Sequence, residues 1–453
     1  RLPPAPPPIM SSYGSLLHCQ RPGWTDAARG LARLAARRGG GKRRGYVVVA
    51  VVEEVLVVVV IVGIYGGYFG AGMGILMLAI LAFLPDDAVE RYLARRPEHR
   101  PTPLHDLPAL ARAAGVASIR VKDEGRRLGL GSFKALGGAY AVDRLVAQRG
   151  KDGLVVTCAT DGNHGRAVAW GARRAGIRAV IYVHEGVSEG RAEAIRSLGA
   201  EVVREGYNYD ASVRASAEAA AKNGWQIVSD TSWPGYEEVP RDVMQGYAVL
   251  AMEAAEQISA KSREVDAGSH QDFAGKTHTK PTHIFIQGGV GGVAAAILSH
   301  GWETIGANRP KLIVVEPENA ACLFESAKAG AVTNVTGDLE TIIAGLACGE
   351  PSILAWKILE PGADAFMTVT DKDAIAAMRD LAAQHVVGGE SGVAGLAGFF
   401  KAAGHPEMRR ALGLDATSRV LLIGTEGATD AAVYSELVGK SPEEIRTPEE
   451  VVR

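Results

Sequence analysis

The stretch Ser132-Phe-Lys-Ala-Leu-Gly-Gly138 is followed a short way along the chain by Thr160-Asp-Gly-Asn-His-Gly165. A lysine between an aromatic residue and a glycine-containing helix start can form an imine with an aldehyde cofactor, if partial burial keeps its amine neutral. The apolar run 135–142 favours burial of Lys134 over exposure to solvent. In the second stretch, Asn163 could donate a hydrogen bond to a phenolic oxygen of the cofactor. The two stretches therefore predict a lysine-linked cofactor site.

A third stretch has the pattern of a strand, a glycine turn and a helix start. The apolar run Thr282–Gln287 leads into the turn, and the apolar run 293–298 follows it. Backbone N–H groups at a helix N-terminus bind anions, and glycines let a phosphate group come close. The predicted phosphate-binding residues are Gly288, Gly289, Val290, Gly291 and Gly292. Together, the three stretches favour pyridoxal phosphate (PLP) as the cofactor.

The glycine turn also allows two other interpretations. One is an ordinary turn between a strand and a helix. The other is a dinucleotide-binding fingerprint, Gly289-x-Gly291-x-x-Ala294, with Glu316 ending the next predicted strand where a ribose-binding acid would lie. A nicotinamide enzyme has no use for the lysine and asparagine stretches, whereas a PLP enzyme uses all three. The combination therefore favours PLP.

Further motifs lie between about Arg96 and about Leu437. They include Arg100-Pro-Thr-Pro-Leu104, Asp230-Thr-Ser-Trp233, Gly389-Glu-Ser-Gly392 and Thr425-Glu-Gly427. With them the chain resembles the fold type II PLP-dependent enzymes and, among these, the diaminopropionate ammonia-lyase family. The resemblance implies an α/β fold of two αβα domains, as in the tryptophan synthase beta-like superfamily, that face each other across a cleft.

The resemblance also implies how the chain divides into domains. The large PLP domain is expected at 86–132 and 242–453, and the small domain at 133–241 is inserted into it. The N-terminal extension before 86 is expected to have no counterpart in the family. A homodimer in the cytoplasm is expected, with a small amino acid as substrate.

Five residues receive cofactor-related roles from the resemblance. Lys134 would bind PLP and then act as a base near Cα of the substrate, while Phe133 would border the cofactor. Asn163 would contact the ring oxygen, and Ser391 would approach the ring. Thr425 would offer a hydroxyl near the pyridine nitrogen, which weakens the electron sink and favours β-elimination over transamination.

Two aspartates are the expected partners of the lysine in catalysis. Asp161 stands where related serine and threonine dehydratases usually have a small neutral residue. In the family this aspartate serves the D-isomer of the substrate, and the lysine serves the L-isomer. Asp230 matches a second carboxylate in the family's substrate pocket. Roles in stabilising a turn or capping a helix remain open for both, and His164 is expected to be mainly structural.

The expected reaction is the α,β-elimination of 2,3-diaminopropionate, through aminoacrylate, to pyruvate and two molecules of ammonia. One alternative is a PLP lyase of the serine or threonine dehydratase type. The other is a non-catalytic, membrane-tethered protein that binds amino acids or nucleotides.

Composition fits an enzyme and excludes some other classes. The 453 residues carry 49 basic and 51 acidic side chains, and this balance gives no basic footprint for nucleic acid. The cysteines lack metal-ligand spacing, so no metal site is predicted. With 47% hydrophobic residues, the chain has ample material for a core.

The N-terminal extension has a different composition. Residues 1–44 are rich in proline, glycine and arginine and are predicted to be disordered. The segment 45–85 is hydrophobic, and Leu56–Leu84 within it carries no charge and is long enough to cross a membrane. This uncharged run is similar to a fragment of the sulfite exporter (TauE/SafE-like) permeases. A fused or misassigned start, a membrane tether and a soluble segment remain open, and the catalytic domain is expected not to need residues 1–90.

Short apolar runs that alternate with amphipathic stretches predict a parallel sheet covered by helices. The predicted strands are Leu154–Ala159, Ala179–Val183, Glu201–Val203, Gln226–Val228, Thr282–Gln287, Leu312–Val315 and Val420–Ile423. The predicted helices between them are Arg166–Ala175, Glu189–Leu198, Tyr209–Asn223 and Val243–Ile258. Ser259–Lys280 is predicted to be a surface loop, and the histidines 270, 278 and 283 are expected to be solvated.

Overall fold

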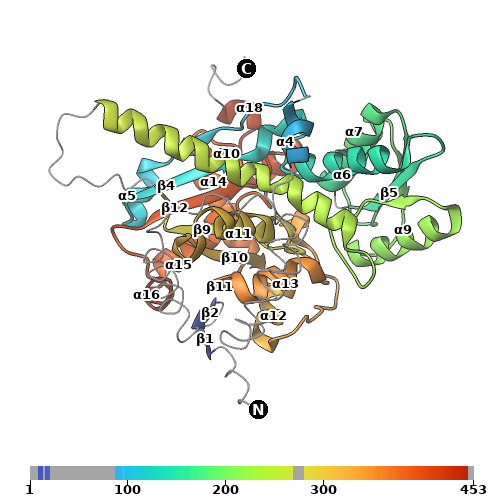
Figure 1. Cartoon of the computed structure of the whole chain (residues 1–453). Coiled ribbons are helices and arrows are strands. Elements are labelled where there is room, and N and C mark those ends of the chain that lie inside the picture. Colours follow the sequence, from blue (N-terminus) through green and yellow to red (C-terminus); the bar gives the residue numbers. More distant parts are fainter. Residues whose placement is uncertain are drawn as a thin grey trace, which may run out of the picture.

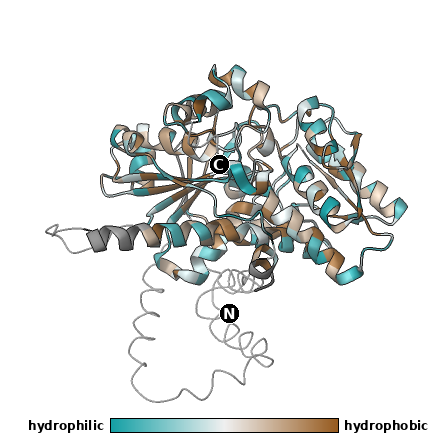
Figure 2. Cartoon of the chain, turned by 90° about the horizontal axis from the view of Figure 1, so that it is seen from above, coloured by the Kyte–Doolittle hydropathy of each residue, from teal (hydrophilic) through white to brown (hydrophobic). Residues whose placement is uncertain are grey.

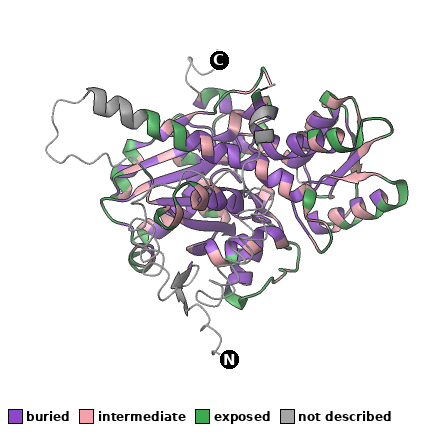
Figure 3. Cartoon of the chain, viewed as in Figure 1, coloured by how far each residue is buried: buried purple, intermediate pink, exposed green. Residues whose placement is uncertain are grey.

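The computed structural model describes residues 9–13, 16–20, 87–94, 96–160, 162–268 and 280–446. In this part of the chain the strands form one sheet of eight and one of four. Figure 1 shows the two sheets in separate lobes, each covered by helices. The central strands of both sheets are largely buried, and exposed residues gather on the outer helices and loops (Figure 3). The fold is therefore the predicted α/β architecture.

The smaller sheet is entirely parallel, with the strand order β7-β6-β5-β8. Its strands are β5 (Val155–Ala159), β6 (Arg178–Val183), β7 (Glu201–Arg204) and β8 (Gln226–Ile227). Its helices are α7 (Asn163–Ala175), α8 (Glu189–Arg196) and α9 (Tyr209–Asn223), joined at one end by α6 (Lys134–Arg149). The predicted strands and helices of this region are confirmed, with small shifts at their ends. All of its strands lie within the predicted inserted domain.

The larger sheet has the order β1-β2-β11-β10-β9-β12-β4-β3. Its strands are β1 (Ile9–Tyr13), β2 (Leu16–Gln20), β3 (Leu104–Asp106), β4 (Ser118–Asp123), β9 (His283–Gln287), β10 (Lys311–Pro317), β11 (Ala365–Val369) and β12 (Arg419–Gly424). The five strands from β11 to β4 are parallel, and β3 pairs antiparallel at one edge. The sequence pattern predicted β9, β10 and β12. It missed β3, β4 and β11. In β4 charged residues interrupt the apolar run, although Lys122 in this strand is fully buried in an ion pair with Glu253.

The first strands of the chain correct the prediction of disorder for 1–44. Strand β2 pairs antiparallel with β11, and β1 pairs with β2. Leu16 is fully buried and Leu17 is 3% exposed, so this hairpin contributes to the core of the larger sheet. The hydrophobic segment 45–85 lies outside the described residues, and so does the permease-like run 56–84. Among the helices that the structure does describe, none has the length and apolarity that a membrane span requires.

The long helix α10 (Glu238–Gly268) corrects a second prediction. It continues through residues 259–268, which were expected to be a loop, because this stretch is rich in good helix formers. His283 is also buried, not solvated, and its Nε2 lies 3.0 Å from the backbone oxygen of Leu412. His270 and His278 lie outside the described residues.

The remaining helices belong mostly to the larger lobe, where hydrophobic residues gather on the strands and the inner faces of the helices (Figure 2). They are α4 (Asp87–Ala94), α5 (Pro108–Ala114), α11 (Gly292–Thr304), α12 (Cys322–Ala329), α13 (Ile353–Gly362), α14 (Asp371–Ala382), α15 (Ala394–Gly404), α16 (Pro406–Leu412), α17 (Ala431–Val438) and α18 (Pro442–Ile445). Short 3-10 turns are η1 (Glu124–Gly129), η2 (Gly306–Asn308) and η3 (Ala344–Leu346).

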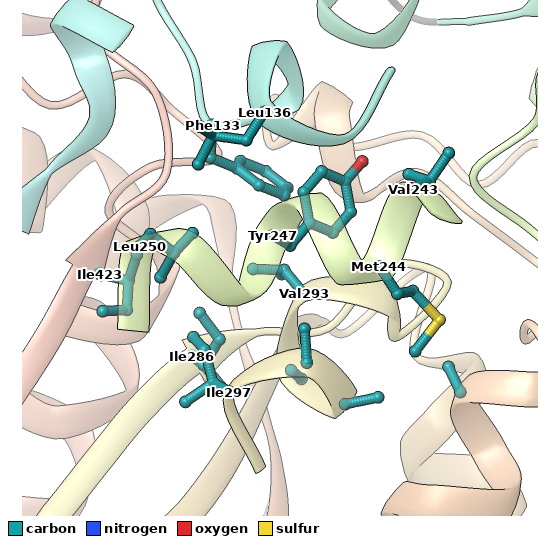
Figure 4. Close-up of a cluster of buried hydrophobic side chains, with 14 of the residues drawn as sticks. Phe133, Leu136, Val243, Met244, Tyr247, Leu250, Ile286, Val293, Ile297 and Ile423 are labelled. Carbon is teal, nitrogen blue, oxygen red and sulfur yellow. The ribbon is translucent and has the colours of Figure 1, made fainter. Parts of the chain in front are cut away.

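Two glycines set the position of helix α6, which begins at Lys134. A Cβ atom on Gly137 would lie 2.4 Å from the backbone oxygen of Val243, and one on Gly246 would lie 2.5 Å from that of Leu136. The backbones of α6 and α10 therefore touch at this crossing, and any larger residue would push them apart. Figure 4 shows the apolar cluster that surrounds the crossing. This close packing fixes where the lysine enters the site.

Candidate active site

A cleft between the two lobes collects most of the predicted site residues. The empty space in it is about 840 Å³, which includes the open mouth of the cleft. Of the predicted residues, its lining includes Phe133, Lys134, Asn163, Asp230, Gly288, Gly289, Val290, Gly292, Ser391 and Thr425. Gly291 is not in the lining, because it turns toward Ala355 and Leu359 below the loop. Asp161 lies outside the described residues.

Lys134 and Asp230 form an ion pair inside the cleft. Burial disfavours the charged amine, but the Asp230 carboxylate outweighs it and raises the pKa of Lys134 above its usual value. Burial likewise opposes the charge on Asp230, yet the charge of Lys134 holds the pKa of this carboxyl below its usual range. The Tyr209 hydroxyl donates to Asp230 Oδ1 at 3.2 Å. The expectation of an amine kept neutral by burial is therefore wrong for this arrangement, because a carboxylate lies against the lysine.

His164 is buried beside this pair and is neutral. Its Nε2 lies 2.7 Å from the backbone oxygen of Val228, and since a carbonyl only accepts, this nitrogen carries the hydrogen. Burial lowers the pKa of His164, although the Asp230 charge opposes this effect. Its Nδ1 lies 4.0 Å from Asp230 Oδ2. These contacts suit a structural imidazole better than a proton donor.

The glycine loop 288–292 has the features of a phosphate cradle. It joins β9 to α11, and Gly289 and Gly291 adopt φ angles of 58° and 98°, which favour glycine. No side chain caps the N-terminus of α11, so the N–H groups of its first turn are open to an anion. Both conformation and chemistry fit the phosphate of PLP.

Glu316 does not suit the role of a ribose-binding acid. It is fully buried at the end of β10 and accepts hydrogen bonds from the backbone N–H groups of Leu323 and Phe324, at 3.0 and 2.7 Å. Its carboxylate thus caps helix α12. Burial raises the pKa of Glu316 to about 8. Because both oxygens of Glu316 accept hydrogen bonds from the helix, this residue is not placed to bind a ribose. The dinucleotide interpretation therefore lacks the acidic residue that it requires.

Several cleft residues escaped the sequence analysis. Glu426, Arg191, Tyr209 and Tyr247 all line the cleft. Glu426 stood inside the quoted Thr-Glu-Gly motif, so a signal for it existed. Tyr247 comes from α10, and its ring lies 4.6 Å from that of Phe133 (Figure 4). Tyr247 belongs to the stretch Met244-Gln-Gly-Tyr247, which also matches the family, so a signal for it existed as well. No local pattern marks Tyr209 or Arg191, which reach the cleft only through the packing of helices.

Contacts between the lobes close one side of the cleft. Arg191 of α8 forms an ion pair with Glu390, which is fully buried. Next to it, the Ser188 hydroxyl donates to Asp430 Oδ2 at 2.7 Å. Glu350 forms a further ion pair between the lobes, with Arg214 of α9, and this pair is exposed. The two lobes are thus joined by charged and polar side chains beside the site.

Comparison with known proteins agrees with this geometry. A family model described as pyridoxal-phosphate dependent enzyme matches residues 95–426. The diaminopropionate ammonia-lyase of Salmonella typhimurium is 39% identical over 374 residues, which cover 76% of this chain and 89% of the relative. The diaminopropionate ammonia-lyase of Escherichia coli is 40% identical over 364 residues, covering 75% of this chain and 87% of the relative. The matched model leaves out residues 56–84, and none of these findings supports their likeness to the permeases.

Solved structures give the same picture. The crystal structure of diaminopropionate ammonia lyase from Escherichia coli, in complex with an aminoacrylate-PLP azomethine reaction intermediate, superimposes with a TM-score of 0.70 at 37% identity. That match covers 78% of this chain and 91% of the solved chain. A threonine deaminase from Solanum lycopersicum matches with a TM-score of 0.61 at 21% identity, which shows a shared fold.

Proposed function

The chain belongs to the diaminopropionate ammonia-lyase family of PLP-dependent enzymes, and from this we infer that it converts 2,3-diaminopropionate by α,β-elimination to pyruvate and two molecules of ammonia. One observation carries the inference to this chain's own residues. In the cleft, Lys134 is paired with a carboxylate and lies next to the glycine loop 288–292, which leads into a helix N-terminus that no side chain caps. These are the parts that a PLP lyase requires.

PLP is the cofactor of this family, and the cleft contains groups suited to each part of it. Bound PLP supplies an electron sink that weakens the bonds at Cα of an amino acid. We assign the phosphate to the loop 288–292, the aldehyde carbon to Lys134 and the ring oxygen to Asn163. Thr425, which is buried at the end of β12, would meet the pyridine nitrogen. Its hydroxyl favours elimination over transamination.

Lys134 and Asp230 are the proposed centre of proton transfer. In its neutral form, the amine of Lys134 would take the α-proton of the L-isomer, and the adjacent Asp230 carboxylate would stabilise the positive charge that the amine then carries. The hydrogen bond from Tyr209 keeps Asp230 oriented toward the lysine. Asp161 is proposed to serve the D-isomer, on the basis of the sequence motif alone.

A direct assay tests the proposed function. The purified protein, loaded with PLP, is supplied with D- or L-diaminopropionate, L-serine or L-threonine, and pyruvate or 2-oxobutyrate is measured together with ammonia. We expect two ammonia per pyruvate from diaminopropionate and a kcat/KM for serine that is at least about tenfold lower. Lys134→Ala, prepared in the same way, is the matched control and should be inactive.

The opposite preference would contradict the proposal. A kcat/KM for serine or threonine above that for diaminopropionate would identify a dehydratase, and turnover by Lys134→Ala would overturn the assignment of the lysine. The homodimer and the cytoplasmic location remain predictions, and light scattering of the purified protein tests the former.

A further inference from the structure

The turn after β12 is connected to two other segments of the active site through its backbone. The N–H of Gly427 donates to the oxygen of Gly131 at 3.0 Å, just before the segment that carries Lys134. On its other side, the N–H of Gly389 donates to the oxygen of Glu426 at 3.0 Å. Glu426 is therefore held between the lysine segment and the 389–392 segment.

The side chain of Glu426 extends these connections across the cleft. Its Oε1 accepts the backbone N–H of Ser391 at 2.9 Å, and its Oε2 accepts Nδ2 of Asn163. Asn163 is the first residue of α7 in the smaller lobe, whereas Glu426 belongs to the larger lobe. Glu426 is only 3% exposed and lines the cleft. One carboxylate thus joins both lobes at the site.

The chemistry of a carboxylate determines how Asn163 is oriented. An ionised carboxylate only accepts hydrogen bonds, so it selects the Nδ2 side of the asparagine amide and turns Oδ1 away. One hydrogen of Nδ2 is used by Glu426, and the second stays available for another acceptor. Hydrogen bonds to a charged acceptor are also stronger than those between neutral groups. Glu426 can therefore fix both the position and the rotation of this amide.

We propose that Glu426 is a positioning residue that holds Asn163 in the orientation needed to donate to the ring oxygen of PLP. The proposal rests on the proposed function only in so far as PLP is the cofactor. Because Asn163 belongs to the smaller lobe and Glu426 to the larger one, their hydrogen bond also makes the binding of the PLP ring depend on the relative position of the two lobes. Glu426 itself acts through Asn163 and need not touch the reacting atoms.

A double-mutant cycle tests this role. The dissociation constant of PLP and the absorption maximum of the bound cofactor are measured for wild type, Glu426→Gln, Asn163→Ala and the double variant. Glutamine keeps an acceptor for Ser391 but places an amide where the Nδ2 acceptor was. We expect Glu426→Gln to weaken PLP binding by roughly tenfold or more and to shift the absorption maximum. In the Asn163→Ala background it should have little further effect.

Asp430→Asn is the matched control, because Asp430 also accepts a hydrogen bond from the smaller lobe but does not line the cleft. Its PLP affinity and spectrum should match the wild type. If Glu426→Gln does not fold, Glu426→Asp provides the second route, since the shorter side chain keeps the carboxylate but cannot reach both Asn163 and the Ser391 N–H, and it should give a loss in the same direction.

Three results would overturn the role of Glu426. These are wild-type PLP affinity and spectrum in Glu426→Gln, losses that add fully in the double variant, and an equal loss in Asp430→Asn. Failure of the wild type to bind PLP at all would instead refute the proposed function, so the two failures are distinguishable.

Discussion

Asp230 lies directly against Lys134 in this cleft and raises the pKa of its amine, which favours the charged form. A lysine buried without a partner would lose its proton more easily. The pair has a consequence for stereochemistry, because a base fixed on one side of the substrate reaches the α-proton of one isomer only. A second base on the other side is therefore required for the mirror-image substrate. The sequence offers Asp161 for this task.

Asp161→Asn tests the assignment of the two bases. Asparagine keeps the size and hydrogen bonding of aspartate but removes the base, so kcat/KM for D-diaminopropionate should fall by roughly 10²-fold or more. Activity on the L-isomer should fall less, since Lys134 still reaches its α-proton. Steady-state kinetics on both isomers provide the measurement. Equal losses would reduce Asp161 to a structural or charge-pairing role, and no loss would favour the dehydratase reaction.

Strand β2 shows how an element far from the site in sequence joins the core of the larger lobe. It covers the edge of β11, and Leu16 lies in the same apolar cluster as Ile313 and Met367 of the neighbouring strands. This packing weighs against the expectation that residues 1–90 are dispensable, which deletion of these residues would test. Removing it would uncover an apolar strand edge, which favours aggregation.

Leu16→Ala measures the contribution of this strand. A fully buried leucine reduced to alanine usually costs about 2–5 kcal/mol in the free energy of unfolding. Denaturant unfolding of the PLP-loaded protein should show a loss of this size. Val332→Ala, at a position that is 44% exposed, is the control and should change little. Equal stability of Leu16→Ala and wild type would mean that β2 does not belong to the core.

At the scale of the whole molecule, buried charges hold the two lobes together beside the site. Glu390 receives Arg191 from the smaller lobe, and it also lies near Glu426. Burial, and then the charge of Glu426, raises the pKa of Glu390 from 4.5 to about 7 against the opposing effect of Arg191. A group that titrates near neutrality therefore lies at this contact between the lobes.

The sign of the resulting pH dependence follows from linkage. Between pH 4.5 and about pH 7 the folded protein holds a proton on Glu390 that the unfolded chain has lost. The stability that this proton contributes is therefore fully present below pH 4.5 and is lost as the pH rises through about 7. Glu390→Gln cannot titrate. Its free energy of unfolding, relative to wild type, should increase from about pH 5 to about pH 8 in denaturant unfolding. The unpaired Arg191 of the variant adds a penalty that does not change with pH, and a constant difference would refute the raised pKa.

Much of the fold and of the candidate site could be predicted from the sequence. Apolar runs predicted the parallel strands of the smaller sheet, most directly the central strands β5 and β6, because strands that are buried on both faces consist mainly of apolar residues. The motifs around Lys134, Asn163 and the loop 288–292 predicted the cofactor, because each is a local arrangement of backbone and side chain.

Other features were decided only by the tertiary structure. The ion pair of Lys134 with Asp230, the contact of Asn163 with Glu426 and the docking of β2 on β11 all join residues far apart in the chain. The charge state of Lys134 depends on whether a carboxylate or an apolar side chain lies against it, and composition does not settle that choice. The sequence by itself determined which chemical groups the protein possesses and which short elements carry them. Only the tertiary structure decided which groups meet, because distances across the cleft follow from the packing of whole helices and sheets.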